Sequence, residues 1–203
     1  MISPRTLVAT VNFSDASHTA LVLAARLARH CGADAHVLYV EDPLLDAGAG
    51  RVGIDLAASS RLELRRLIRD EWQAPECPPQ LHVVAGPEVD VILDVAHQHD
   101  ADLIVIANRR ISRLERLVFG STTERLLHRS DRSVLIAPAA WTPPEAPALD
   151  ASAHGRQTLA GVLGSCIEVV RGGKGSAAAS LAYRALSAAT VPILVQVVES
   201  VLG

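Results

Sequence analysis

The stretch of sequence that decides the fold is residues 103–138, LIVIANRRISRLERLVFGSTTERLLHRSDRSVLIAP. It begins with an apolar run at residues 103–106, continues through an arginine-rich turn to Gly120 and Ser121, and ends in a second apolar run at residues 134–136. This order predicts a strand, a loop, a helix and a second strand. A Gly-Ser pair that opens a helix leaves backbone N–H groups unpaired at the positive end of the helix dipole, where a phosphate can bind.

Strands and helices also alternate in the part of the chain that precedes this stretch. Apolar and β-branched runs predict strands, and apolar residues at helical spacing predict helices. The predicted strands are residues 6–11, 36–40 and 81–84, and the predicted helices follow Asp15, span residues 54–72 and begin near Pro87, with a loop at residues 41–53. Together with the last two strands, this order predicts an α/β fold with a doubly wound, five-stranded parallel sheet. Such sheets bind ligands at the carboxyl ends of their strands.

The composition of the 203 residues limits the classes of function. The formal net charge of −3 gives no electrostatic reason to expect nucleic-acid binding. No apolar run is long enough for a membrane span or a signal peptide. The three cysteines, Cys31, Cys77 and Cys166, are odd in number and widely spaced, so the sequence predicts neither a disulfide framework nor a zinc site. This is typical of a protein whose cysteines are reduced. We therefore expect a cytoplasmic protein without nucleic-acid or membrane partners.

Residues 1–138 resemble a universal stress protein domain along their full length, and the most specific part of the match is the tail GSTTERLLHRSDRSVLIAP. The resemblance implies a sheet of the adenine nucleotide alpha hydrolase-like type. It also implies a stress-response protein that forms dimers and either binds ATP or works through protein contacts. We expect that it is not an enzyme, because the sequence offers no activated nucleophile or metal ligands near Gly120.

The nucleotide loop of ATP-binding members has the pattern Gly, two residues, Gly, nine residues, then Gly-Ser or Gly-Thr. The three glycine positions fall here at Ala107, Arg110 and Gly120, followed by Ser121 and Thr122. Arginine at position 110 puts a long charged side chain where the loop should be bare. We therefore expect that ATP with Mg is not bound in the usual family manner and that the protein acts as an interaction protein.

The adenine side of the family pocket is lined by an Asp after the first strand and by the end of the second strand. Asn12 stands in place of that Asp, and Val40 ends the second strand. Asn keeps the acceptor oxygen but loses the charge, which weakens the expected adenine contact.

The arginine-rich loop leaves three interpretations open. Arg109, Arg110 and Arg113 could hold the phosphates of a nucleotide together with Gly120 and Ser121, which is the alternative function. Arg110 could instead fill the vacant pocket and pair with a carboxylate, or the arginines could simply be solvated. Ser121 with Glu124 also fits a helix capping box, which needs no ligand.

Two other groups of polar residues can be explained without a bound metal ion or a catalytic role. His97, His99, Asp100 and Asp102 lie at a helix-to-strand turn, where alternate side chains need not converge, so no metal site is predicted there.

Ser14, Asp15 and His18 lie within one helical turn. A helix cap at Ser14 and an exposed histidine account for them, so no catalytic residue is predicted.

The C-terminal part of the chain is predicted to be a linker at residues 139–154 followed by a short α/β extension at residues 155–203 that resembles a partial repeat. Gly175 and Ser176 repeat the Gly-Ser pair, and a strand is predicted at residues 191–198, between Val191 and Val198. Family members commonly dimerise through their last strand, here residues 134–137 between Val134 and Ala137. We expect either that two copies pair through this edge in a homodimer, or that residues 191–198 of the same chain take the place of the second copy. We also expect an unknown protein partner.

Overall fold

The computed structural model describes residues 3–72, 74–108, 121–138, 168–172 and 192–197. Its strands form one seven-stranded sheet in the order β3-β2-β1-β4-β5-β7-β6. The strands are β1 (Thr6–Val11), β2 (Asp34–Glu41), β3 (Gln80–Ala85), β4 (Leu103–Asn108), β5 (Ser133–Pro138), β6 (Glu168–Gly172) and β7 (Ile193–Val197). The first five strands in chain order are all parallel to one another, which confirms the predicted α/β fold with a five-stranded parallel sheet.

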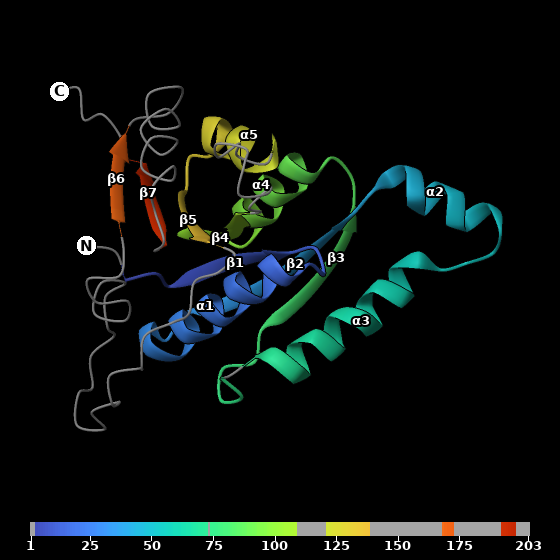
Figure 1. Cartoon of the computed structure of the whole chain (residues 1–203), viewed down its shortest axis with the longest axis horizontal. Helices are drawn as coiled ribbons and strands as arrows, with labels where there is room; N and C mark the ends of the chain where they lie inside the picture. Colours follow the sequence, from blue (N-terminus) through green and yellow to red (C-terminus); the bar gives the residue numbers. More distant parts are fainter. Residues whose placement is uncertain (1–2, 73, 109–120, 139–167, 173–191, 198–203) are drawn as a thin grey trace, which may run out of the picture.

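Helices cover both faces of this sheet (Figure 1). One face packs against α1 (Asp15–Cys31) and α3 (Leu56–Glu71), and the other against α4 (Glu88–Gln98) and α5 (Ser121–Arg129). Alternate residues of β1 separate the two cores, because Leu7 and Ala9 belong to the first and Val8 to the second. The central strands β1, β4 and β5 are therefore buried on both faces, as their continuous apolar runs require, whereas no residue of the edge strand β3 is buried.

The prediction of a loop at residues 41–53 is wrong, because the structure forms α2 (Pro43–Arg51) there. Asp42 is the N-cap and its side chain accepts a hydrogen bond from the backbone N–H of Leu44, while Pro43 has the fixed φ that suits a first helical turn. No residue of α2 is buried. Figure 1 shows α2 and the adjoining end of α3 extending away from the sheet.

Three apolar residues of α3 at helical spacing pack against the core, whereas Leu62 is half-exposed. Leu64 is fully buried, whereas Leu62 is 52% exposed. Leu67 and Ile68 pack against the core that contains Leu64. Leu62 lies two residues before Leu64, which places it on another side of the helix.

The tail strands extend the sheet beyond β5. β7 pairs with β5 in antiparallel orientation, and β6 pairs with β7 in parallel orientation. Leu194 packs into the core on the α1 face, while Ile193 and Val195 pack into the core on the α4 face. β5 is therefore an interior strand, and all six of its residues are buried. The predicted linker at residues 139–154 and the Gly-Ser pair at residues 175 and 176 lie outside the described residues.

Among the described residues, no helix is both long enough and apolar enough to cross a membrane.

Candidate functional site

The predicted nucleotide site lies where β1, β2 and β4 reach their carboxyl ends. Asn12 directly follows β1, Val40 lies near the end of β2, and Ala107 lies near the end of β4. Because neighbouring parallel strands end at the same edge of the sheet, the fold brings these three positions to that edge. Arg109, Arg110, Arg113 and Gly120 lie outside the described residues.

The side chain of Asn12 is engaged by the turn that joins β1 to α1. Its Oδ1 atom accepts hydrogen bonds from the hydroxyls of Ser14 and Ser17, both at 2.6 Å, and from the backbone N–H of Ser14 at 3.3 Å. The backbone N–H of Asn12 donates to Ser17 Oγ at 2.9 Å. Ser14 occupies the predicted N-cap position of α1, but its hydroxyl bonds to Asn12 and not to the helix. The Asn12 oxygen therefore closes a local turn.

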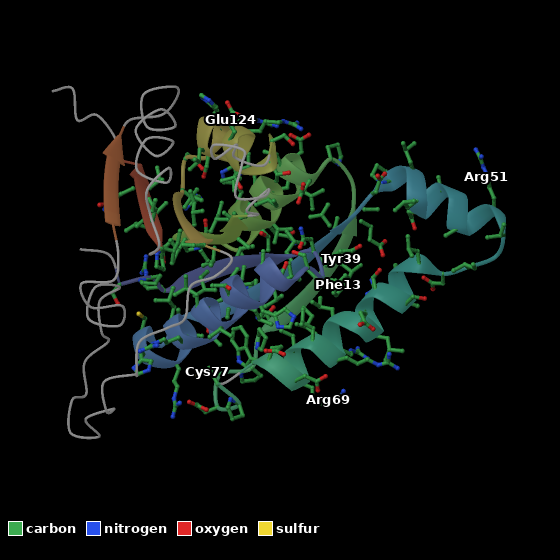
Figure 2. All side chains as sticks on the ribbon, in the orientation of Figure 1. Phe13, Tyr39, Arg51, Arg69, Cys77 and Glu124 are labelled. Atoms are coloured by element: carbon green, nitrogen blue, oxygen red, sulfur yellow. The ribbon has the colours of Figure 1, made fainter. Side chains whose placement is uncertain are left out.

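An aromatic pair that the sequence did not predict lies beside this turn. The ring of Phe13 packs on the ring of Tyr39, with centroids 4.4 Å apart and an interplanar angle of 43° (Figure 2). Phe13 has a φ of 56°, a left-handed conformation that is uncommon for a bulky residue. Burial, and after it the charge of Glu41, raises the pKa of Tyr39. The two rings cover the α1 face of the strand ends, the face to which both side chains belong.

The N-terminus of α5 carries a carboxylate contact. α5 begins at Ser121, and the hydroxyl of Thr122 donates to Glu88 Oε2 at 2.6 Å. Glu88 is the first residue of α4, so this bond joins the N-terminal turns of the two helices. Glu124 adds a second carboxylate to the first turn of α5. Negative charge is stabilised at a helix N-terminus, and these carboxylates supply it without a ligand.

The polar residues predicted not to converge at the turn after α4 contact different partners. His97 Nε2 lies 2.9 Å from Asp131 Oδ1, and Asp102 accepts hydrogen bonds from the backbone N–H groups of Arg5 and Thr6. His99 lies against two other histidines, His36 and His82. Those two were missed because they are far from His99 in the sequence and each lies within an apolar strand.

Ser14 and His18 do not combine into a catalytic arrangement. The Ser14 hydroxyl bonds to Asn12, whereas His18 Nδ1 lies 3.3 Å from Glu71 Oε1 of α3. A polar contact between half-exposed side chains stabilises the packing of α1 on α3 only slightly.

Comparison with known proteins identifies the class of this α/β domain. The model of the universal stress protein family matches residues 4–138. A stretch of 71 residues is 35% identical to the stress response protein NhaX of Bacillus subtilis (strain 168), and the match covers 35% of this chain and 41% of that protein. The matched stretch thus spans less than half of the curated relative.

Solved structures share the fold over about two thirds of the chain. A universal stress protein in complex with cAMP has a TM-score of 0.51 at 23% identity, covering 68% of this chain and 98% of the other. The universal stress protein UspA from Lactobacillus plantarum has a TM-score of 0.53 at 24% identity, covering 65% and 96%. A universal stress protein from Archaeoglobus fulgidus has a TM-score of 0.51 at 24% identity, covering 65% and 97%. The chain belongs to the universal stress protein family, as its sequence resemblance implied.

Proposed function

We propose that this chain is a cytoplasmic stress-response protein that acts through protein contacts, is not an enzyme, and does not bind ATP with Mg in the usual family manner. The observation that carries the proposal is the bond between Thr122 and Glu88 at the start of α5. A phosphate bound to the first turn of α5 would lie next to the Glu88 carboxylate. Two unit charges 4 Å apart repel by about 1 kcal/mol in water and by about 4 kcal/mol at the lower effective dielectric of a protein surface.

The adenine side of the pocket supports the same proposal. The Asn12 oxygen already accepts three hydrogen bonds, so an adenine amino group would have to compete with Ser14 and Ser17 for it. The amide oxygen of an asparagine has two lone pairs, and the three hydrogen bonds that Asn12 Oδ1 accepts already exceed that number. The described residues therefore fit an adenine nucleotide poorly on both the base side and the phosphate side.

A role in protein contacts is supported by the apolar surface of the projecting helices. Leu44 and Leu45 of α2 are 81% and 65% exposed. Val52 and Ile54, between α2 and α3, and Leu62 of α3 are also more than half exposed. Several large, exposed apolar side chains in one part of the chain are typical of a surface that contacts another protein.

We further propose that β7 replaces, within one chain, the partner strand through which family members dimerise. The support is the pairing of β7 with β5 along Val134, Leu135 and Ile136. In this proposal residues 1–138 are the stress protein domain and residues 155–203 a partial repeat that supplies the strand. The edge at residues 134–137 is then unavailable to a second copy.

The function is tested by calorimetric titration of the full-length, nucleotide-stripped protein with ATP and Mg²⁺. We expect no heat of binding from the unaltered chain. A double variant with Ala107→Gly and Arg110→Gly restores the glycine loop, and we expect it to bind ATP. A triple variant that also carries Glu88→Gln lacks the opposing charge, and we expect it to bind ATP more tightly than the double variant. Binding by the unaltered chain at micromolar ATP would overturn the proposal.

The alternative is a nucleotide-binding stress protein. It is favoured by the fold shared with a universal stress protein in complex with cAMP and by the helix N-terminus at Ser121. In this alternative Arg109, Arg110 and Arg113 bind the phosphates together with Gly120 and Ser121. Loss of binding on replacing these arginines with glutamine would support it.

A further inference from the structure

Three histidines from distant parts of the sequence meet at the amino end of the sheet. His36 is the third residue of β2, His82 is the third residue of β3, and His99 directly follows α4. In the strand register His82 is opposite Leu38, and Leu38 belongs to the core on the α4 face. Side chains two residues apart on a strand share a face, so His36 and His82 both face α4. This histidine cluster lies at the edge of the sheet opposite to the predicted nucleotide site.

The imidazole nitrogens of the histidine cluster are close enough to share one ion. One nitrogen from each ring can be chosen so that all three lie within 4.8 Å of one another. His36 Nδ1 and His82 Nε2 are 3.0 Å apart. The rings of His36 and His99 stack with centroids 4.0 Å apart, and those of His82 and His99 are 5.0 Å apart.

The three imidazoles are shielded from solvent to different degrees. His36 is only 3% exposed, and His82 and His99 are partly buried. Burial first, and then His99 and His82, lowers the pKa of His36 to about 4. Burial, followed by His99, also lowers the pKa of His82. A neutral imidazole has one free lone pair, which is what a metal ion requires.

We propose that His36, His82 and His99 bind one divalent transition-metal ion of the zinc type. Zinc in proteins takes imidazole nitrogens at about 2.0–2.1 Å, which places two nitrogens of a tetrahedral site about 3.3 Å apart. The 3.0 Å separation of His36 Nδ1 and His82 Nε2 is already near this value. The remaining nitrogens need to approach one another by roughly 1.5 Å, from within 4.8 Å to about 3.3 Å, and rotation of the two partly buried rings, His82 and His99, can supply this movement.

The number and type of the ligands fit this class of metal. Three histidines leave the fourth position of a tetrahedral ion to water, as in zinc sites with three protein ligands. Imidazole suits zinc, copper and nickel, whereas magnesium and calcium prefer oxygen. A bound ion would link β2, the edge strand β3 and the turn between α4 and β4. It would also bind independently of any nucleotide, because the two sites lie at opposite ends of the strands.

The competing explanation is a purely structural contact. One neutral histidine can donate its ring N–H to the other, so the 3.0 Å contact of His36 and His82 is also compatible with a hydrogen bond in a stacked group. The two explanations differ in one respect, because only the metal site requires the lone pairs of all three rings.

The test is calorimetric titration of the tag-free, chelator-treated full chain with zinc chloride. We expect one zinc per chain for the unaltered protein and at least about tenfold weaker binding for His82→Gln and for His99→Gln, because even residues that only support metal ligands change affinity by about 10–100-fold. His97→Gln is the matched control, since His97 is also an imidazole at the end of α4 but pairs with Asp131. It should bind zinc like the unaltered chain. Equal binding in all four proteins, or no stoichiometric binding at all, would overturn the proposal.

Two further measurements separate ligand loss from misfolding and identify the donor atoms. Circular dichroism and the Tm of the metal-free variants show whether His82→Gln and His99→Gln fold, and zinc should raise the Tm of the unaltered and His97→Gln chains only. Cobalt(II) substituted for zinc should give the visible absorption of a tetrahedral nitrogen site. A sulfur-to-cobalt charge-transfer band would instead assign the ion to cysteine and overturn the proposal.

Discussion

Leu135 of β5 and Leu194 of β7 are direct partners at the centre of the antiparallel pairing that joins the tail to the family domain. Val134 pairs with Val195 on one side and Ile136 with Ile193 on the other. In the predicted partial repeat, residues 193–195 align with residues 134–136, so Leu194 is the equivalent of Leu135 and each strand contributes equivalent residues to the pairing. This is the contact pattern of a two-fold interface between two copies of one strand.

The first prediction is that a chain ending at Pro138 forms a dimer, whereas the full chain does not dimerise through β5. Removing β7 would expose a buried apolar strand, and such an edge pairs readily with a second copy. Light scattering coupled to size-exclusion chromatography measures both masses. A full chain with Leu194→Asp is the control that keeps the length but disfavours burial of β7, and it should also shift toward the dimer. A truncated chain that is folded and monomeric would contradict this prediction.

The second prediction compares two leucines of α3. Leu64→Ala should lower the free energy of unfolding by about 2–5 kcal/mol, because Leu64 is fully buried and its truncation leaves a cavity. Leu62→Ala should change it by no more than about 0.5 kcal/mol, because Leu62 is 52% exposed. Urea unfolding followed by circular dichroism measures both. Similar losses in the two variants would mean that α3 packs on the sheet through another side.

Much of the fold was predictable because most of the parallel strands are continuous apolar runs and because capping residues mark the ends of the helices between them. The predicted first strand and the observed β1 have the same bounds, and Gly32 ends α1 in the left-handed conformation. α2 was missed because its glycines suggested a loop, although Asp42 followed by Pro43 is a helix start signal. That helix forms through local capping without burying a residue.

The site was less predictable because its contacts join residues that are far apart in sequence. Asn12 could be placed at the end of β1 from the family pattern, but its bonds to Ser14 and Ser17 depend on how the turn folds. The contact of Thr122 with Glu88 spans 34 residues and that of His36 with His82 spans 46. Neither pairing leaves a local pattern in the sequence.

The third prediction concerns the turn between β1 and α1. Asn12→Ala should lower the free energy of unfolding by about 1–3 kcal/mol, because the donors of Ser14 and Ser17 lose their acceptor. Asn12→Asp, which restores the residue of ATP-binding relatives, should be much milder because a carboxylate oxygen accepts the same bonds near a helix N-terminus. Urea unfolding at pH 7 measures the difference. Equal losses in the two variants would show that the oxygen is not what holds the turn.

The fourth prediction is a pH dependence at Asp131. Its hydrogen bond with His97 is the main cause that lowers the pKa of Asp131. A lowered carboxyl pKa stabilises the fold above the pKa of the unfolded chain, and this stabilisation is lost as the pH falls through the folded-state pKa. Asp131→Asn should therefore cost about 0.5 kcal/mol at pH 6, a small value because both side chains are more than one third exposed, and progressively less below about pH 4. Urea titrations at several pH values test this, and a cost that grows on acidification would contradict it.

The fifth prediction concerns the reactivity of two free thiols, Cys31 and Cys77. Cys31 is fully buried in the core, and burial raises the pKa of its thiol to about 11, so both access and the thiolate form are suppressed. Cys77 is partly exposed in the loop after α3 (Figure 2). Iodoacetamide at pH 8 should therefore label Cys77 within the time that leaves Cys31 untouched, and peptide mass spectrometry distinguishes the two sites. In urea above the unfolding midpoint both should react at similar rates, which provides the control. Rapid labelling of Cys31 in the native protein would mean that α1 separates from the sheet far more often than its dry, fully buried face implies.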